Sequence, residues 1–81
     1  VLDDADIDAA VAAGVRGRIA NAGQACTASK RFIVVETVYE EFTRKFIAAV
    51  TAIATGDPTS PDTFLGPLSS SGAVDELEEI V

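Results

Sequence analysis

Four consecutive apolar residues, from Phe32 to Val35, constrain this chain more than any other feature of its sequence. A run without polar alternation is typical of a strand that is covered on both faces, as in a parallel sheet. Such a strand needs neighbours along its edges, and two strands alone do not make a stable sheet. The only other strand signal is Val1-Leu2, which resembles the end of a strand. We therefore expect the 81 residues to be an excerpt of a larger α/β domain or to depend on a partner.

A first helix is predicted between these two strand segments. Its apolar residues recur every four positions, which is the spacing of one helical face, at Ile7, Val11, Val15 and Ile19. Asp3-Asp4 is expected to supply the N-cap, because aspartate accepts hydrogen bonds from the free N–H groups of a first turn. Gly14 and Gly17 lie within the same pattern. Such small residues suit close packing, which we expect against an element outside the chain.

A second helix is predicted over residues 38–54. Thr37 and Glu40 have the spacing of a capping box at its start. Gly56 is expected to end the helix, and Pro58 to prevent its resumption. The apolar residues of this segment again share one face and predict a buried stripe.

A proline-rich loop is predicted over residues 56–69, followed by a last helix. Ser70 or Ser71 is expected to cap that helix, in which Val74, Leu77 and Val81 share one face. The predicted order is therefore strand stub, helix, turn, strand, helix, loop, helix. This alternation is typical of α/β domains.

The chain carries a formal net charge of −7 at pH 7. Negative charge disfavours nucleic acid and anionic membrane surfaces as partners, because both repel it. No apolar run reaches the ~18–20 residues that a membrane span requires, and no signal peptide is apparent. The single cysteine excludes an internal disulfide, and a free thiol fits a reducing compartment such as the cytoplasm.

Several catalytic arrangements are absent because the sequence contains no histidine. Cys-His pairs, Ser-His-Asp triads and HExxH metal sites all need that side chain, and one cysteine does not complete the usual zinc ligand sets. No glycine-rich phosphate-binding motif is present either. We therefore assign no metal and no cofactor site within the chain, and Cys26 is left as the one nucleophile to consider.

Cys26 lies in a window without acidic residues, between Asp8 and Glu36. That window holds four of the six basic residues, Arg16, Arg18, Lys30 and Arg31. Positive charge near a thiol favours the nucleophilic thiolate and attracts an anionic substrate. The alternative stays open, because a free cysteine commonly serves as a small buried apolar residue.

The segment from Asn21 to Val34, NAGQACTASKRFIV, resembles the active-site cysteine motif of the aldehyde dehydrogenase superfamily. The flanking stretches VLDDADIDAAV, VYEEFTRKF and GDPTSPDTFLGPL resemble the elements before and after that motif in the same order. The similarity covers essentially the whole chain and is greatest to the succinate-semialdehyde dehydrogenase branch. It implies that residues 1–81 are part of the catalytic domain, without the cofactor-binding domain.

The resemblance implies that the Cys26 thiolate attacks an aldehyde, that hydride passes to NAD or NADP, and that water hydrolyses the resulting thioester. It implies a loop-shaping role for Asn21, Gly23 and Gln24. Residues flanking the nucleophile would line the substrate tunnel, namely Ala25 and Thr27. The general base, the oxyanion asparagine and the cofactor site of the family lie in other segments, so we expect the isolated chain to be inactive.

Two positions depart from the branch. Ala20 stands where many members have an arginine that binds the substrate carboxylate, and Ala28 stands where some have a second cysteine. The resemblance implies as partners a small aldehyde, with succinate semialdehyde as the substrate of this branch, and the rest of a homo-oligomeric parent enzyme. The competing hypothesis is a non-catalytic, truncated remnant that serves as an interaction or oligomerisation module. A stand-alone thiol redox protein is disfavoured by the lack of a CxxC pair.

Overall fold

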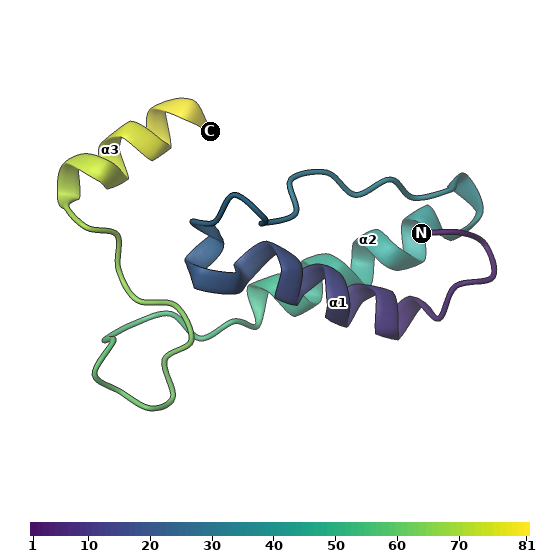
Figure 1. The fold of residues 1–81 in the computed structure, drawn as a ribbon, viewed down its shortest axis with the longest axis horizontal. Helices are drawn as coiled ribbons and strands as arrows, with labels where there is room; N and C mark the ends of the chain where they lie inside the picture. Colours follow the sequence, from purple (N-terminus) through teal and green to yellow (C-terminus); the bar gives the residue numbers. More distant parts are fainter.

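Two helices, α1 (Ile7–Ile19) and α2 (Glu36–Thr51), lie side by side in the computed structural model, which describes all residues 1–81. The short 3₁₀ helix η1 (Ala20–Gly23) continues α1, and an extended segment returns along the pair before α2 begins (Figure 1). The third helix, α3 (Ser71–Ile80), lies apart from this pair. None of these helices is both long and apolar enough to cross a membrane.

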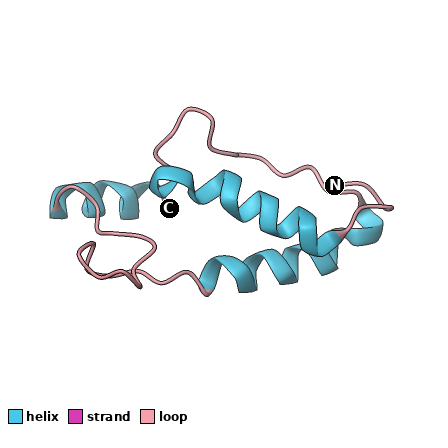
Figure 2. Cartoon of the chain, turned by 60° about the horizontal axis from the view of Figure 1, so that its bottom comes forward, coloured by secondary structure: helices cyan, strands magenta, loops and turns pink.

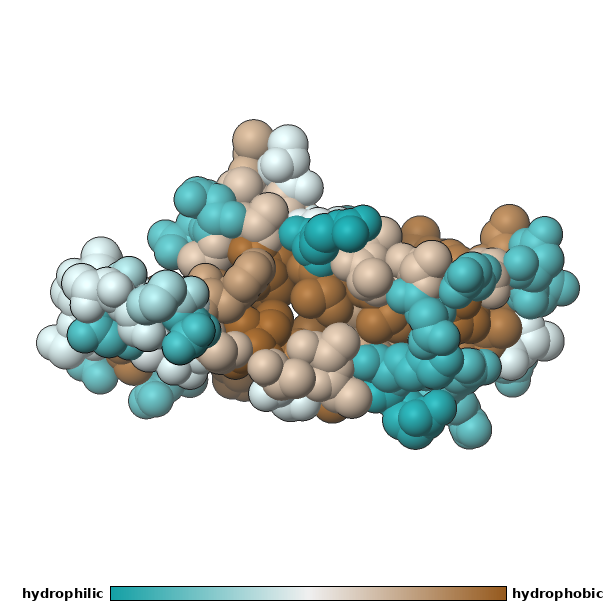
Figure 3. All heavy atoms as spheres, turned by 90° about the horizontal axis from the view of Figure 1, so that it is seen from below, coloured by the Kyte–Doolittle hydropathy of each residue, from teal (hydrophilic) through white to brown (hydrophobic).

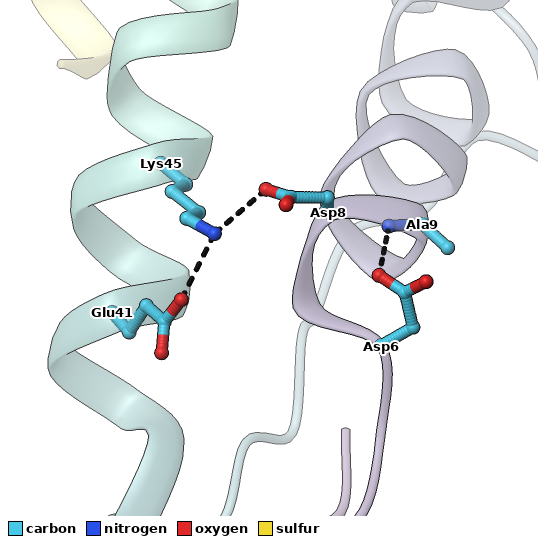
Figure 4. Close-up of polar contacts among 5 residues, drawn as sticks. All are labelled: Asp6, Asp8, Ala9, Glu41 and Lys45. Carbon is cyan, nitrogen blue, oxygen red and sulfur yellow. Dashed lines mark hydrogen bonds and ion pairs between the residues drawn. The ribbon is translucent and has the colours of Figure 1, made fainter.

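α1 begins after Asp6, and not after the predicted Asp3-Asp4 cap. The Asp6 Oδ1 accepts a hydrogen bond from the Ala9 N–H at 3.0 Å (Figure 4). Asp3 and Asp4 lie in the preceding turn, which the Ala5 N–H closes by donating to the Leu2 carbonyl. The predicted cap was therefore wrong by two to three residues, because the closely spaced aspartates at positions 3, 4, 6 and 8 offer the same local signal.

α2 begins at Glu36, directly after the apolar run, and its N-cap Val35 provides no side-chain hydrogen bond. The predicted capping box at Thr37 is wrong, because Thr37 already lies inside the helix. The helix ends at Thr51 and so stops short of the predicted residue 54. Beyond that end, the Ala54 carbonyl accepts hydrogen bonds from the loop N–H groups of Phe64 and Leu65, at 2.9 and 3.0 Å.

The core lies between α1 and α2. Ile7 and Val11 of α1 are buried against Phe42 of α2, which is only 4% exposed. The rings of Phe42 and Phe46 stack at 5.6 Å between centroids, and Phe32 from the return segment lies 4.8 Å from Phe46. At the edge of this core an ion pair also joins the two helices, since the Lys45 Nζ lies 2.7 Å from the Asp8 Oδ1 (Figure 4).

The glycines of α1 pack against residues of this chain, which corrects the expected outside partner. A Cβ on Gly14 would lie 3.1 Å from the Phe32 ring and 3.2 Å from the Phe46 ring. A Cβ on Gly17 would lie 2.9 Å from the Ser29 Oγ. The return segment and α2 therefore approach α1 where its side chains are smallest.

The predicted strand at 32–35 is not formed, and Figure 2 shows helices and loops only. The segment is nevertheless paired at one point. The Val1 amino group donates to the Ile33 carbonyl at 2.7 Å, and the Val35 N–H donates to the Val1 carbonyl at 3.1 Å. This is the hydrogen-bond pattern of neighbouring parallel strands. Val1 alone cannot extend this pairing into a ladder, and the Ile33 side chain is left 85% exposed.

α3 starts where predicted but packs on nothing. The Ser70 Oγ accepts a hydrogen bond from the Ala73 N–H at 3.2 Å and caps the helix. The shared apolar face that includes Leu77 is exposed. Only four of the 81 side chains are buried, and brown apolar atoms cover the middle of the face seen in Figure 3. The chain therefore leaves much apolar surface uncovered.

Candidate functional site

Cys26 lies at the tip of the thiol loop, which we define as residues 23–29. The loop follows η1, and its centre is a turn in which the Ala28 N–H donates to the Ala25 carbonyl at 3.0 Å. The Cys26 side chain is exposed within these 81 residues. The alternative of a cysteine that fills this chain's own core therefore does not hold.

Backbone conformation sets the entry to the loop. Asn21, Ala22 and Gly23 have φ values of 52°, 57° and 74°, three successive residues in the left-handed region. Asparagine and glycine tolerate that region, whereas alanine adopts it at a cost of about 1–2 kcal/mol. The Asn21 Nδ2 donates to the Gln24 carbonyl at 3.1 Å, and the Gln24 N–H donates back to the Asn21 carbonyl. The structure thus brings together the three motif-loop residues that the sequence singled out.

Two of the four basic side chains in the window bind carbonyl groups of the thiol loop. The Arg18 Nη1 donates to the Ser29 carbonyl at 3.0 Å and its Nη2 donates to the Gly23 carbonyl at 3.3 Å. The Lys30 Nζ donates to the carbonyls of Cys26 and Ala28 at 3.2 and 3.0 Å. The sequence pattern predicted only a positive electrostatic field from these cations, and not these direct contacts with the loop carbonyls. For Arg18, its position in the last turn of α1 was the available signal, because basic side chains there often bind free carbonyls.

The loop exit is held against α1. The Ser29 N–H donates to the Gly17 carbonyl at 3.0 Å, and the Ser29 side chain occupies the space that a Cβ on Gly17 would need. A larger residue at position 17 would therefore force the Ser29 side chain to shift. The loop is consequently fixed to α1 at its exit and by Arg18 at both ends.

Ala25 and Thr27 flank Cys26 in the same turn, as their sequence positions require. Ala25 is half-buried and Thr27 is exposed. Neither residue lines a hollow of this chain, so the predicted tunnel wall stays a prediction. Ala28, which stands in place of a second cysteine, is buried and only 4% exposed.

A separate apolar hollow of about 360 Å³ opens where the ends of α1 and α2 meet the following loop. It is lined by Val15, Arg16, Ile19, Ala52, Ile53, Ala54 and Phe64. Cys26 is not part of it. No three carboxylate or thiol side chains come close enough to hold a metal ion. The thiol loop is therefore the candidate functional site of these residues.

Comparison with known proteins identifies relatives of the whole chain. The family model described as "Aldehyde dehydrogenase family" matches residues 1–81. The chain is 47% identical over its full length to an NADP(+) succinate-semialdehyde dehydrogenase of Mycobacterium leprae (strain TN), and it spans 18% of that protein.

Two solved structures share the fold of this chain over nearly its whole length. Gox0499 superimposes with a TM-score of 0.86 at 47% identity, over 96% of this chain and 17% of that one. A 3,6-anhydro-L-galactose dehydrogenase in complex with NAP has the same TM-score at 39% identity, over 98% of this chain and 17% of its own. The resemblance predicted from the cysteine motif is thereby confirmed, and the chain belongs to the aldehyde dehydrogenase family.

Proposed function

We propose that the complete protein is an NADP-dependent succinate-semialdehyde dehydrogenase and that Cys26 is its nucleophile. The observation that carries this proposal is the 47% identity, over every residue of the chain, to a relative of that name. The exposed thiol at the tip of a fixed loop supports it, because a nucleophile must reach its substrate in a defined position. The chain spans 18% of that relative, so the proposal concerns the protein to which these residues contribute.

The first covalent step belongs to this chain. The Cys26 thiolate adds to the aldehyde carbon, an S–C bond forms, and the carbonyl electron pair moves to the oxygen. A hydrogen-bond donor near that oxygen would stabilise the developing charge. Ala25 and Thr27 are small neighbours of the thiol, and we propose that they border the aldehyde. We propose that the base for the later hydrolysis of the thioester lies in another segment of the complete protein.

We propose that these 81 residues do not themselves form the dinucleotide site. A phosphate cradle needs glycines whose backbone is open to the ligand, whereas Gly14 faces Phe32, Gly17 faces Ser29 and Gly23 faces Arg18. NADP, which the relative's name specifies, would therefore be bound by other segments, where it serves as hydride acceptor.

We also propose that residues 32–35 form a strand of a parallel sheet in the complete protein. The two hydrogen bonds with Val1 support this, because they already have the parallel pattern. The N–H groups of Phe32 and Val34 make no hydrogen bond within this chain and are available to a second neighbour. Slow amide exchange of both groups in the complete protein is expected. Exchange at the rate of a free peptide would contradict the proposed strand.

The function is tested with the protein expressed from its complete reading frame. We expect NADPH to form when succinate semialdehyde and NADP⁺ are supplied, and Cys26→Ser to lower kcat by about a thousandfold or more. Thr59→Ser, in an exposed loop far along the chain from Cys26, serves as the control and should leave kcat unchanged. Full activity of Cys26→Ser would refute the assigned nucleophile.

A second measurement tests the substrate. Butanal has the same carbon count as succinate semialdehyde but no carboxylate. If a cation binds that carboxylate, kcat/KM should favour the semialdehyde by roughly tenfold or more, since a charged hydrogen bond contributes about 1.5–3 kcal/mol. Ala20 supplies no cation, so equal values for the two aldehydes would redirect the assignment to neutral substrates.

The remnant hypothesis makes the opposite prediction. The exposed apolar side chains of Ile33, Leu77 and Ile80 would also suit an assembly module. A reading frame that ends without a cofactor domain, and a product without dehydrogenase activity, would favour that alternative.

A further inference from the structure

Arg18 is the one side chain that reaches both ends of the thiol loop. Its two terminal nitrogens donate to the carbonyls of Gly23 and Ser29, which lie three residues before and three residues after Cys26. Both contacts are partly buried. The guanidinium therefore closes the loop at its base, opposite the tip that carries the thiol.

The two ends of the thiol loop depend on Arg18 to different extents. Ser29 is also bound to Gly17 through its N–H, so the loop exit has a second attachment. At the entry, the side-chain hydrogen bond to α1 is the Arg18 contact with Gly23, and the backbone there passes through Ala22 at a φ of 57°. A strained backbone keeps such a conformation only where its surroundings hold it. Loss of the Arg18 side chain should therefore disturb the backbone at Gly23 first.

The geometry requires a fork and not simply a positive charge. Arginine presents its N–H donors in a fixed planar arrangement, so one side chain can serve two carbonyls at once. Lysine carries a single ammonium on a flexible stem. No carboxylate lies in contact with Arg18, whose recorded partners are both backbone carbonyls.

We infer that Arg18 is a positioning residue, which holds Cys26 at the substrate by tying the two ends of the thiol loop together. The inference rests on the proposed function, because it treats Cys26 as the nucleophile. Arg18 itself does not touch the substrate. Its effect passes through the backbone, and misplacement of a reacting group by about 1 Å can cost roughly a hundredfold in rate.

The test uses the protein from its complete reading frame with the variants Arg18→Gln and Arg18→Lys. Arg44→Gln is the matched control, because Arg44 is exposed on α2 and takes part in no polar side-chain contact. We expect Arg18→Gln to lower kcat by about 10- to 100-fold while KM for the aldehyde changes less than about threefold. Arg18→Lys should lose most of the same activity.

A second readout separates positioning from charge. Alkylation of Cys26 by iodoacetamide needs an accessible thiolate but no alignment with an aldehyde. We expect the alkylation rate of Arg18→Gln to stay within about twofold of wild type while kcat falls. If the alkylation rate falls in step with kcat, or if Arg18→Lys keeps more than half of the wild-type kcat, Arg18 acts through its charge and the inference is overturned.

Amide exchange keeps this inference separate from the proposed function. Even in a protein without dehydrogenase activity, peptides covering residues 23–29 should exchange faster in Arg18→Gln than in Arg44→Gln. Unchanged exchange there would refute the tie itself, whatever the substrate. Exchange that rises only in the loop, in a protein that does not oxidise semialdehydes, would refute the enzyme assignment and leave the tie standing.

Discussion

Residues 1–51 and residues 52–81 differ in how they hold their structure. The first part contains all four buried side chains, namely Ile7, Val11, Ala28 and Phe42. The second part contains a capped helix, α3, that packs on no other helix. The first is stabilised by contacts between distant segments, whereas the second shows only what local signals can specify. An isolated helix as short as α3 is marginal in water, and its apolar face is exposed in these 81 residues.

The largest expected effect contrasts Phe42 with Leu77. Phe42→Ala removes a ring that is 4% exposed and should destabilise α1 and α2 by about 3–5 kcal/mol. Leu77 is 51% exposed, so Leu77→Ala should cost far less in these 81 residues. The free energy of local opening, measured by amide exchange, compares the two. If Leu77→Ala proves equally costly in the complete protein, α3 is buried there and the contrast belongs to this segment alone.

The next effect contrasts two glycines. Gly14→Val should destabilise the helix pair by roughly 1–3 kcal/mol, because even a Cβ there meets the Phe32 and Phe46 rings. Gly72→Ala should instead stabilise α3 by up to about 1 kcal/mol, since its nearest neighbour is the Ser70 Oγ at 3.9 Å. Thermal unfolding of both variants checks the opposite signs. A stabilising Gly14→Val would show that the two helices are loosely packed.

The two helix caps give a smaller contrast. Asp6→Ala and Ser70→Ala each remove one side-chain acceptor and should each cost about 1 kcal/mol. Because α1 packs on α2, the Asp6 variant should also raise amide exchange in α2. The Ser70 variant should change exchange in α3 only. If each variant raised amide exchange in both α2 and α3, the two parts of the chain would be coupled.

The smallest effects concern pH. Hydrogen bonds to Asp8 and then to Glu41 raise the pKa of Lys45 above its ordinary 10.5. The stability from this ion pair is therefore fully present below the unfolded value and is lost as pH rises through the folded pKa. An NMR titration of the Lys45 ε-methylene should report the raised pKa. Asp8→Asn should bring it back toward 10.5, and no change in that variant would exclude the Asp8 contact in solution.

In the second part of the chain the pH response has the opposite sign. Hydrogen bonds from the Thr59 hydroxyl and N–H lower the pKa of Asp57 below its ordinary 3.8. This turn is therefore favoured above the unfolded value and weakens as pH falls through the folded pKa. A titration of the Asp57 carboxylate by NMR, with Thr59→Ala as comparison, measures the shift. An Asp57 pKa that is equal in both proteins would contradict the assigned cause.

The features that the sequence predicted correctly depend on short stretches of residues. The features that it missed depend on contacts between residues far apart in the chain. The helices, the Ser70 cap and the turn around Cys26 follow from short patterns, and the structure contains them. The strand at Phe32 to Val35 does not form, because its stability depends on neighbouring strands that 81 residues do not supply. The position of Arg18 at the end of a predicted helix signals that it can bind carbonyls, but the choice of Gly23 and Ser29 depends on how the loop folds back on α1. The family assignment succeeded because the cysteine motif is itself local.

The parallel course of α1 and α2 has a consequence for synthesis. A short turn cannot join parallel helices, so the chain must return along α1 and bring residues as far apart as Val1 and Ile33, 32 positions apart, into contact. On the ribosome, α1 emerges first, and its contacts with α2 can form only after α2 has been made. At ~5–20 residues per second, that interval is on the order of seconds. During that interval, Ile7 and Val11 lack the Phe42 ring that buries them in the folded chain.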